Sequence, residues 1–449
     1  MRIMDRKEPI LLFLGDILIF TFALWLSLFI RNLGFPPAFE FYSHLTPFSF
    51  IFLVWMFSFF VAGLYEKHTV MLKNKLPGVI LNTQIFNSII AALFFYFIPY
   101  FGIAPKTMLF IYLFVSFFLI LVWRIYGERL FGFKDREKAI LIGSGAEMRD
   151  LKNEINNNSR YSIELVSSVD LDKTENLDFQ SEILDRIYSE GISIIVIDLQ
   201  NKKVEPILLH LYNLIFSKIK FTDMHKIYED IFDRVPLSLL RYNWFLENIS
   251  FSSNTGYSIL KRAMDIAIST IIGTVSLAIY PLVILLIKLD DGGSIFISQE
   301  RVGQNNKIVK IYKFRSMSVN DDGIAEKDKV RKITRAGKFL RKTRVDELPQ
   351  LWSILKGDMS LVGPRPEMPS LVKLYEKEIP YYNIRHLIKP GLSGWAQLYQ
   401  NTPPKFDVGS DQTKIKLSYD LYYIKNRSFL LDLKIALKTL KALLSRSGV

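Results

Sequence analysis

The sequence predicts a membrane protein with a four-helix transmembrane bundle, a Rossmann-like α/β domain and a mainly α-helical, membrane-apposed domain. Three observations lead to this fold class. Half of the 449 residues are hydrophobic, and the long apolar runs are concentrated in the first third of the chain. Strand-like and helix-like segments alternate in the middle, and a proline-broken apolar run precedes a basic C-terminal part. The predicted domains are residues 1–130, 136–250 and 255–449.

Four long apolar runs form the predicted bundle. Each is close to the roughly 20 residues that a helix needs to cross a bilayer. The first run lacks a small-residue cleavage site, so we interpret it as a retained anchor and not as a signal peptide. Asp16 lies within it, either as a functional group or as a partner in a helix-packing hydrogen bond. The runs are residues 9–30, 47–64, 79–101 and 108–123.

The basic residues around these runs predict their orientation. Lysines and arginines stand before the first run, between the second and third, and after the fourth, whereas the other two loops carry little beyond Arg31 and Lys106. By the positive-inside rule, the N-terminus and everything after the fourth run face the cytoplasm. These basic residues are Arg2, Arg6, Lys7, Lys67, Lys73, Lys75, Arg124, Arg129, Lys134, Arg136 and Lys138.

The stretch from 136 to 250 has the pattern of an α/β domain. Residues 138–142 and 193–197 are interpreted as its first and second strands, each followed by helix, which is typical of a parallel sheet of Rossmann type. The turn at Gly143 and Gly145 is weak evidence for a nucleotide. Met148 replaces the third glycine of the dinucleotide fingerprint, and no clear ribose-binding acid follows. A vestigial or regulatory domain is therefore favoured over a working cofactor site.

A fifth apolar run, residues 266–289, opens the last domain. Pro281 lies inside it, where proline removes a helical hydrogen bond and breaks or kinks the helix. One interpretation is an ordinary span with a kink. The segment from Arg301 to Arg344 is strongly basic, however, and moving it outside would oppose the charge rule. A re-entrant helix over 262–290, which enters and leaves on the cytoplasmic side and bends at Pro281, is favoured because it fits both facts.

Residues 428–447 form a predicted amphipathic helix. Leucines at helical spacing alternate there with Lys434, Lys438, Lys441 and Arg446. This pattern suits a helix that lies in the membrane interface. Packing of the leucines on the domain's own core explains it equally well.

The composition excludes several kinds of site. The chain has no cysteine, which excludes disulfides, thiolate nucleophiles and cysteine-based zinc sites. The five histidines show no metal-ligand spacing. The net charge of +13 suits nucleic acid, an anionic membrane surface or phosphorylated substrates. Because the chain has transmembrane segments, nucleic acid is the least favoured of these partners.

One adjacent carboxylate pair, Asp346 and Glu347, is the candidate catalytic centre. The pair stands just before Leu348 and Pro349, and because proline is tolerated in a first helical turn, a helix is predicted to start there. A single acid at such a place is usually a helix cap. Two carboxylates there also meet the positive end of the helix dipole, which should keep them ionised. One could then attack phosphorus while its neighbour ligates Mg²⁺, which prefers hard oxygen donors and substrate phosphates.

Cations around this pair form the candidate phosphate-binding set. Arg365 stands between Pro364 and Pro366, a rigid setting for a guanidinium that can bind phosphate through paired hydrogen bonds. Each cation alone is more often a solvated surface charge, but a cluster this dense is better explained by a diphosphate. The set is Lys313, Arg315, Arg344 and Arg365, with Arg341 nearby.

From Lys261 to the C-terminus, the chain resembles the bacterial polyprenyl-phosphate sugar-phosphate transferases, the polyprenol-phosphate phosphoglycosyl transferases. The matching motifs occur in the family's order over nearly 190 residues. The N-terminal part also resembles the large members of the family, which place four spans and a Rossmann-like domain before the catalytic part. The motifs are KRAMD, the proline-broken helix, QERVG, KFRSM, TRAGKFLRKT, DELPQLWSILKGDMSLVGPRP, PGLSGWAQL and DLYYIKN.

The resemblance implies an activity at the cytoplasmic face of the bacterial inner membrane. A UDP-sugar and undecaprenyl phosphate would give undecaprenyl-diphospho-sugar and UMP, the first step of exopolysaccharide, capsule or O-antigen synthesis. Asp346 would be the nucleophile, Glu347 would bind Mg²⁺ and Arg365 would hold phosphate oxygens. Arg262 and Asp265 would pair across the base of the re-entrant helix. A homodimer is expected from the resemblance alone.

Two other function classes stay open on the sequence. A membrane-anchored nucleotide-sugar dehydratase or epimerase also combines four spans with a Rossmann domain, but it needs a full glycine fingerprint and a Tyr-x-x-x-Lys pair. The spacing occurs here at Tyr257 and Lys261, outside the Rossmann stretch. A non-catalytic scaffold of a polysaccharide assembly complex has no need of Asp346 and Glu347 together. No residue indicates which sugar is transferred.

Overall fold

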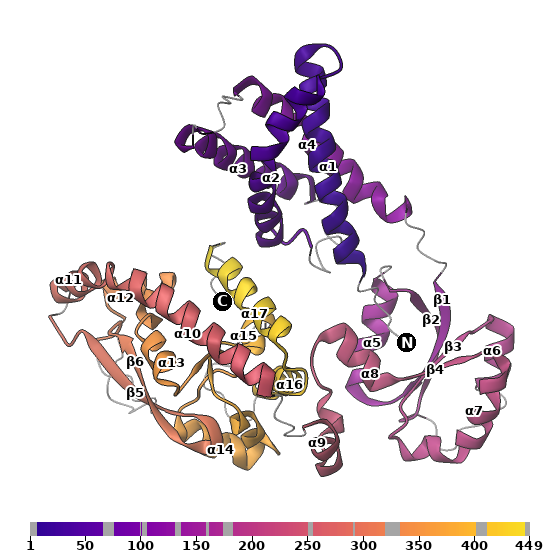
Figure 1. Cartoon of the computed structure of the whole chain (residues 1–449). Helices are drawn as coiled ribbons and strands as arrows, with labels where there is room; N and C mark the ends of the chain where they lie inside the picture. Colours follow the sequence, from indigo (N-terminus) through magenta and orange to yellow (C-terminus); the bar gives the residue numbers. More distant parts are fainter. Residues whose placement is uncertain are drawn as a thin grey trace. The chain divides into compact units, whose positions relative to one another are not determined.

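The chain forms two compact units in a computed structural model, Met1–Ile227 and Tyr228–Val449 (Figure 1). Each unit is described by itself. The structure describes residues 7–65, 76–98, 100, 106–130, 136–158, 161–173, 183–249, 255–290, 292–318, 333–400 and 411–444.

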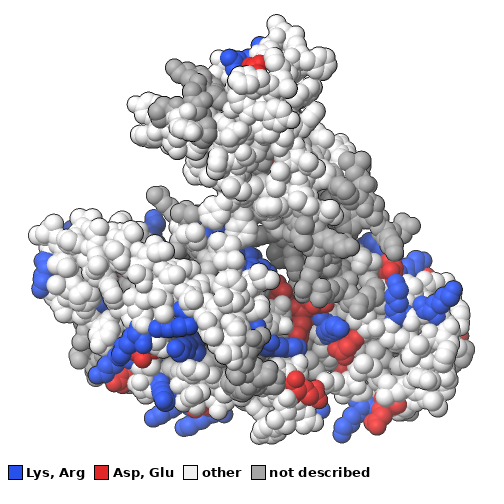
Figure 2. Space-filling view, viewed as in Figure 1, with Lys and Arg blue, Asp and Glu red and all other residues white. Residues whose placement is uncertain are grey.

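Four helices at the start of the first unit are long and apolar enough to cross a membrane. This confirms the predicted four apolar helices, and in Figure 2 this part carries almost no charged side chains on the face shown. The second helix begins well before the predicted residue 47, with Pro47 inside it. Of the loop cations, Arg2, Arg6, Lys67, Lys73, Lys75 and Lys134 lie outside the described residues. The helices are α1 (Lys7–Asn32), α2 (Ala38–Val61), α3 (Leu76–Phe97) and α4 (Lys106–Leu130).

Aromatic side chains and one polar cluster pack these four helices together. Trp55 is fully buried against Phe20, Phe48 and Tyr112. Asp16 is fully buried and lies 2.5 Å from an Arg124 guanidinium nitrogen of α4, and it accepts a hydrogen bond of 2.8 Å from the Tyr65 hydroxyl. A charge in an apolar bundle is stable only when it is paired. Of the two roles considered for Asp16, the structure therefore favours helix packing.

A four-stranded parallel sheet follows the helices, with strand order β2-β1-β3-β4. The predicted parallel sheet is confirmed, but residues 193–197 belong to the third strand and not the second. The strand that the sequence analysis missed, β2, alternates buried and exposed residues and lies at a sheet edge, so it lacks a continuous apolar run. The elements are β1 (Glu137–Gly143), α5 (Gly145–Asn157), β2 (Ile163–Asp170), α6 (Asp185–Glu190), β3 (Ile194–Ile197), α7 (Leu208–Leu214), β4 (Lys220–Asp223) and α8 (Met224–Phe232).

The glycine turn after β1 already contacts a carboxylate of its own chain. Gly145 has a φ of +81°, which favours glycine, and its amide donates to Asp172 Oδ2 at 3.2 Å. Met148 is buried in the first turn of α5. A bound phosphate would have to displace Asp172 from that amide, so the geometry gives the nucleotide hypothesis no support.

The second unit is mainly helical, with an antiparallel hairpin and a short parallel strand pair. Its elements are α9 (Tyr242–Asn248), α10 (Thr255–Leu277), α11 (Tyr280–Asp290), β5 (Phe296–Val302), β6 (Ile308–Phe314), α12 (Arg335–Thr343), η8 (Val345–Glu347), α13 (Gln350–Lys356), β7 (Ser360–Val362), α14 (Pro369–Glu378), η9 (Tyr382–Leu387), β8 (Gly391–Ser393), α15 (Trp395–Tyr399), α16 (Asp411–Lys425) and α17 (Phe429–Leu444).

The fifth apolar run is two helices, α10 and α11, bent by 56°. The break falls at residues 278–279, because Pro281 has no amide hydrogen for Leu277 and its ring would clash with that carbonyl. Many side chains on both helices are apolar and exposed, among them Ile271, Val275 and Leu282. The bend is that of a broken span or a re-entrant helix, and the re-entrant path stays a prediction.

Arg262 and Asp265 are not paired with each other among the described contacts, so that expectation is wrong. The Arg262 guanidinium donates to the carbonyls of Ile354 and Leu355, both at 2.7 Å, at the end of α13. Asp265 accepts from Ser360 Oγ at 3.1 Å and the Leu361 amide at 3.0 Å, at β7. The two charges therefore attach α10 to two separate segments.

The C-terminal helix α17 packs one face on the core of this unit. Asp432 and Ile435 are fully buried, and Asp432 accepts hydrogen bonds from Tyr257, Lys261 and Tyr423. Packing on the domain's own core is therefore confirmed for that face. Leucines elsewhere on the helix are exposed, so contact with a membrane interface remains a prediction for them. They include Leu430, Leu433, Leu440 and Leu443.

Candidate functional site

The carboxylate pair lies in a single helical turn, η8, between α12 and α13. Arg344 closes α12 with a left-handed φ of +59°, which turns the chain into η8. The helix expected to start at Leu348 starts at Gln350, after Pro349. Asp346 and Glu347 thus precede the helix, as predicted, but stand two residues farther from its start. The dipole of a seven-residue helix, two residues away, has little influence on them.

Asp346 is a buried carboxylate with a raised pKa. It is 7% exposed, and its Oδ1 has no hydrogen-bond partner. Burial, followed by repulsion from Glu347, raises its pKa to about 6, while Lys313 and the arginines of α12 oppose the shift. The helix dipole does not control this pKa, because burial outweighs it, but with a pKa of about 6 Asp346 is still mostly ionised at pH 7.

Glu347 is the carboxylate around which the cations gather. Burial alone would raise its pKa, but Arg365, Lys313 and Arg344 outweigh burial and hold the pKa at about 2. All three approach the same oxygen, Oε1, at 3.0, 3.6 and 3.8 Å respectively. The adjacent acids therefore differ: Glu347 is a permanent anion inside a cationic shell, and Asp346 gains its charge near neutral pH.

Three of the four predicted phosphate-binding cations meet at Glu347, and one does not. Arg315 instead donates to the carbonyls of Met317 and Ser318 at 3.0 and 2.8 Å. Its guanidinium lies where a side chain on Gly293 would be, so it braces the segment that leads into β5. The described hydrogen bonds thus hold the Arg315 guanidinium to its own loop.

Three of the predicted site residues lie on α10 and α11. They position the segments that neighbour the carboxylate pair in the chain. Arg262 binds the end of α13, the helix that follows Glu347, and Asp265 binds β7, which leads to Arg365. Pro281 sets the bend between the two helices. One apolar helix therefore positions both segments that carry the central charges.

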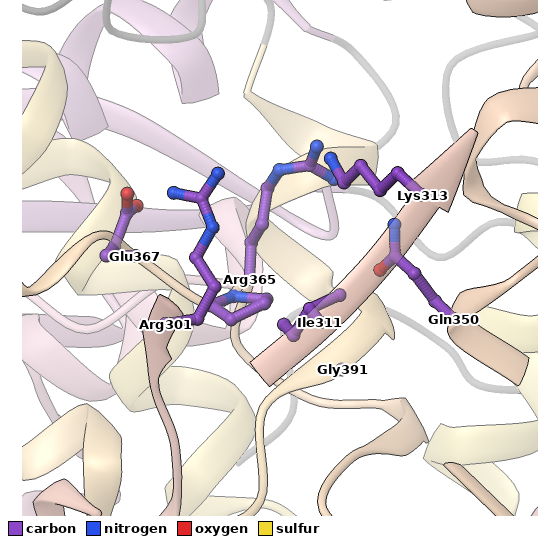
Figure 3. A pocket seen from close by; sticks show the side chains of 8 residues that line it. Arg301, Ile311, Lys313, Gln350, Arg365, Glu367 and Gly391 are labelled. Carbon is purple, nitrogen blue, oxygen red and sulfur yellow. The ribbon is translucent and has the colours of Figure 1, made fainter. Parts of the chain in front are cut away.

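A pocket beside the carboxylate pair is lined by Arg301, Gln350, Lys313 and Arg365 (Figure 3). No role was predicted for Arg301 or Gln350. Both residues lie inside motifs quoted for the family resemblance, QERVG and DELPQLW. Alternation along β5 could have placed Arg301 on one face of a strand. Its position beside Lys313 depends on the register of the hairpin, which no local pattern reveals.

Behind the pocket, a buried charge cluster holds the backbone of Arg365. The Arg385 guanidinium is 1% exposed, lies 2.8 Å from Asp420, and donates to the Arg365 carbonyl at 3.0 Å. Glu367 pairs with both Arg385 and Lys416. Two cations and two anions thus neutralise one another, which such burial requires.

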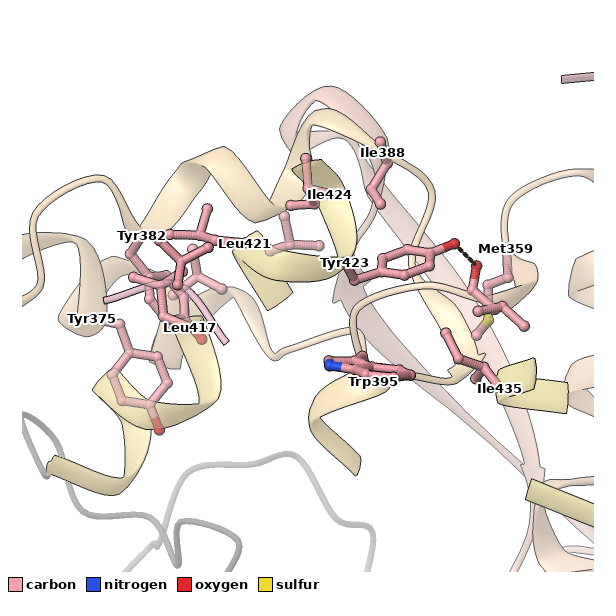
Figure 4. Close-up of a cluster of buried hydrophobic side chains, with 14 of the residues drawn as sticks. Met359, Tyr375, Tyr382, Ile388, Trp395, Leu417, Leu421, Tyr423, Ile424 and Ile435 are labelled. Carbon is pink, nitrogen blue, oxygen red and sulfur yellow. Dashed lines mark hydrogen bonds between the residues drawn. The ribbon is translucent and has the colours of Figure 1, made fainter. Parts of the chain in front are cut away.

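The hydrophobic core beneath this cluster reaches the same turn (Figure 4). Trp395, Tyr382 and Leu421 are fully buried in it. The Tyr423 hydroxyl lies 3.3 Å from the Val362 carbonyl, which precedes the Gly363-Pro364-Arg365 turn. A Cβ on Gly363 would come within 2.5 Å of the Lys389 carbonyl oxygen, so only glycine fits at this position of the turn. The packing of the core therefore fixes the backbone position from which the Arg365 side chain extends.

The carboxylate pair offers oxygen ligands of the kind that Mg²⁺ takes, and phosphate oxygens of the substrate would supply others. No group of three histidine, aspartate or glutamate side chains suited to a metal occurs in the described part of the chain. Mg²⁺, however, commonly takes only one or two protein carboxylates and completes its shell with water and phosphate oxygens. The unpartnered Oδ1 of Asp346 beside the Glu347 carboxylate matches that need for oxygen donors.

Tyr257 and Lys261, the pair that a dehydratase or epimerase would need, are engaged elsewhere. Both donate to Asp432 of α17, at 2.9 and 3.0 Å. Lys261 also donates to the Val362 carbonyl at 3.0 Å. These contacts fasten α10 to α17 and β7, so the spacing has a structural explanation.

Comparison with known proteins matches this unit to sugar transferases. The family model described as "Bacterial sugar transferase" matches residues 256–446. The chain is 42% identical over 195 residues to the UDP-N-acetylgalactosamine-undecaprenyl-phosphate N-acetylgalactosaminephosphotransferase of Aeromonas hydrophila, covering 43% of this chain and 45% of that protein. It is 41% identical over 196 residues to the exopolysaccharide production protein PSS of Rhizobium leguminosarum bv. phaseoli, covering 42% of this chain and 96% of that one.

A third relative has a different sugar in its name. The UDP-glucose:undecaprenyl-phosphate glucose-1-phosphate transferase of Klebsiella pneumoniae is 39% identical over 195 residues, which cover 42% of this chain and 41% of the relative. The chain thus spans less than half the length of the Aeromonas and Klebsiella proteins and nearly all of the Rhizobium protein. The residues that the family model matches contain Asp346, Glu347 and the cations around them.

Proposed function

Because this chain belongs to the bacterial sugar transferase family, we propose that it transfers a sugar 1-phosphate from a UDP-sugar to undecaprenyl phosphate and releases UMP. The observation that carries the proposal is the buried Asp346 beside Glu347 and its shell of Lys313, Arg344 and Arg365. Relatives that share this region are named for undecaprenyl-phosphate sugar transfer. The product would start an exopolysaccharide, capsule or O-antigen repeat unit.

Asp346 is the proposed nucleophile of a two-step exchange. Its ionised carboxylate attacks the sugar-bearing phosphorus of the donor, and the bond from that phosphorus to the bridging oxygen breaks, with the electron pair leaving on UMP. An oxygen of undecaprenyl phosphate then attacks the same phosphorus and displaces the Asp346 carboxylate. Two steps let one site serve a soluble donor and a membrane-bound acceptor in turn.

The cations around Glu347 bind and orient the phosphates in this scheme. Arg365 and Lys313 offer hydrogen-bond donors to diphosphate oxygens, and Glu347 keeps both side chains in place between turnovers. Glu347 and Asp346 would hold Mg²⁺, which neutralises phosphate charge when it is bound. Cations held in place beside a phosphate stabilise the negative charge that develops there.

The proposed location is the cytoplasmic face of the bacterial inner membrane. The four apolar helices indicate a membrane protein, and the basic loops of the sequence favour cytoplasmic placement of the N-terminus and of everything after the fourth helix. A re-entrant path for α10 and α11 would hold the site at headgroup depth. A homodimer is proposed on the family resemblance alone.

Release of UMP by the purified full chain in nanodiscs tests the reaction. With undecaprenyl phosphate, Mg²⁺ and a panel of UDP-sugars, we expect release with one or a few donors and none without the acceptor beyond a single turnover. EDTA should stop release, and Mg²⁺ should restore it. Silence across the panel from folded protein would favour a scaffold.

The pH dependence of transfer should report the pKa of Asp346. Because its pKa is raised to about 6, we expect kcat/KM to rise with pH up to about pH 6 and then level off, instead of levelling off near pH 4. Glu347→Gln removes a neighbouring negative charge that raises this pKa, so its profile should shift to lower pH.

The profiles are measured at saturating Mg²⁺ with the same donor. Asp358→Asn is the control, since Asp358 pairs with the surface residue Lys356 and should leave the profile unchanged. A Glu347→Gln profile that coincides with the wild type in shape would exclude Asp346 as the titrating group.

A further inference from the structure

The pocket beside the carboxylate pair is small and strongly cationic. Its cavity of about 80 Å³ is far below the several hundred Å³ of a pocket that encloses a whole ligand. It can therefore take a charged group of a larger molecule. Its polar lining comes from β5, β6, α13 and the turn after β7, through Arg301, Lys313, Gln350, Arg365 and Glu367.

The hairpin register brings two of the cations to one face. Arg301 lies opposite Val309, and Lys313 lies opposite Ile297. Side chains alternate along each strand, so Arg301 and Lys313 point to the same side. The Arg301 guanidinium donates a hydrogen bond of 2.7 Å to Gln299 Oε1, which orients the Arg301 side chain. Figure 3 shows Arg301, Arg365 and Lys313 along one wall.

Glu347 pairs with two of the pocket's cations, Lys313 and Arg365, and the acid that lines the pocket itself is engaged elsewhere. That acid, Glu367, is already paired with Lys416 and Arg385 behind the wall, and these cations hold its pKa at about 2 although burial would raise it. Burial lowers the pKa of Lys313, the nearby Glu347 carboxylate opposes that shift, and Arg365 and Arg301 lower the pKa further. Three cations in a small space repel one another unless an anion joins them.

Gln350 adds a neutral donor with no use inside the protein. Its side chain is 4% exposed, and its Nε2 has no hydrogen-bond partner. A buried donor without a partner destabilises the protein, and an arriving acceptor would remove that cost. The guanidinium of Arg301 and the amide of Gln350 both serve a group rich in oxygen acceptors, and a phosphate is such a group.

The position of the pocket along the hairpin separates donor from acceptor. Phe296 and Phe314, at one end of the hairpin, pack on Tyr280 of the apolar helix α11. Lys313 is next to that end, whereas Arg301 pairs four residues farther along β6, or about 13 Å at 3.4 Å per residue. A lipid acceptor reaches the site from the apolar helices, so the Arg301 end is left for the soluble donor.

We propose that Arg301 and Gln350, with Lys313 and Arg365, bind the phosphate of the nucleoside monophosphate that leaves the donor. The inference rests on the proposed function and names a subsite of it. When the bond to the bridging oxygen breaks, negative charge develops on this departing phosphate, and fixed donors stabilise that charge. Lys313 and Arg365 lie between Glu347 and the pocket and so serve both phosphates of the donor.

Arg301→Ala should separate the two substrates. We expect the KM for the UDP-sugar and the inhibition constant of UMP each to rise about tenfold or more, as for loss of a charged hydrogen bond. The KM for undecaprenyl phosphate should stay within about twofold of the wild type. Gln350→Leu should shift the same two constants in the same direction, by less. Lys310→Ala is the control, because it removes the same charge from the exposed face of the hairpin.

Titration of UMP into the full chain in nanodiscs, followed by calorimetry, supplies a readout that needs no turnover. Arg301→Ala should weaken UMP binding about tenfold, whereas Lys310→Ala should not. A rise in the KM for undecaprenyl phosphate in place of the donor KM would assign the pocket to the lipid phosphate and overturn the inference. Unchanged UMP binding in Arg301→Ala would overturn it also. If the wild type binds UMP through Arg301 but turns over no UDP-sugar, the proposed reaction fails and the pocket stands.

Discussion

Replacement of Asp346 by asparagine should reduce sugar-phosphate transfer by about 10³-fold or more. The amide cannot form the covalent bond to phosphorus, and loss of a nucleophile typically has an effect of this order. UMP release in nanodiscs measures the loss. A second readout is the single-turnover burst of UMP without acceptor, which should disappear.

The same substitution should not destabilise the protein at neutral pH. The pKa of Asp346 is about 6 in the fold against an ordinary value of 3.8. Between these values the folded chain holds a proton that the unfolded chain has released, so stability falls as pH rises through that window. Above about pH 6, asparagine removes this penalty, and the free energy of unfolding should rise. Full transfer activity in Asp346→Asn would contradict the assignment of Asp346 as the nucleophile. A variant that loses activity because it no longer folds would contradict the predicted rise in the free energy of unfolding.

Replacement of Arg385 by methionine should destabilise the second unit by about 3–5 kcal/mol. The change leaves Asp420 and Glu367 with one cation, Lys416, and an uncompensated buried charge costs about that much. It also removes the hydrogen bond to the Arg365 carbonyl. Chemical denaturation of the detergent-solubilised full chain measures the loss.

Lys414→Met provides the matched control on α16. Lys414 pairs with the exposed Asp411, and such surface pairs contribute at most about 1 kcal/mol. Arg385→Lys should recover part of the stability, because the positive charge remains, but not the activity, because lysine lacks the planar fork that reaches both Asp420 and the Arg365 carbonyl. An Arg385→Met chain as stable as the wild type would show that the buried cluster is not what holds this turn.

Much of the fold follows from patterns that are local in the sequence. The four apolar helices, the strand at 138–142 and the break near Pro281 were predicted from run length and residue type. The missed strand β2 alternates in burial at a sheet edge, so a search for continuous apolar runs overlooks it. The order of strands in the sheet is a tertiary property that no single run contains.

For the candidate site, residue identity and chain order brought Asp346, Glu347, Lys313, Arg344 and Arg365 to attention. The sequence alone could do so because adjacent carboxylates and a proline-flanked arginine are visible as letters. It placed Arg315 in the same set, but the direction of that side chain is fixed by carbonyls of its own loop. The family resemblance also predicted that Arg262 pairs with Asp265, whereas each binds a segment about 90 residues away.

By itself, then, the sequence determined which segments are apolar enough for a membrane and which short motifs carry acids beside cations. Only the tertiary structure decided that Asp346 is buried with a raised pKa, that Glu347 is held ionised, and that Arg301 and Gln350 complete a cationic pocket. The physical reason is that run length and spacing act between near neighbours in the chain. Burial and charge pairing instead depend on residues that folding brings together, as Glu367 and Lys416 are across 49 positions.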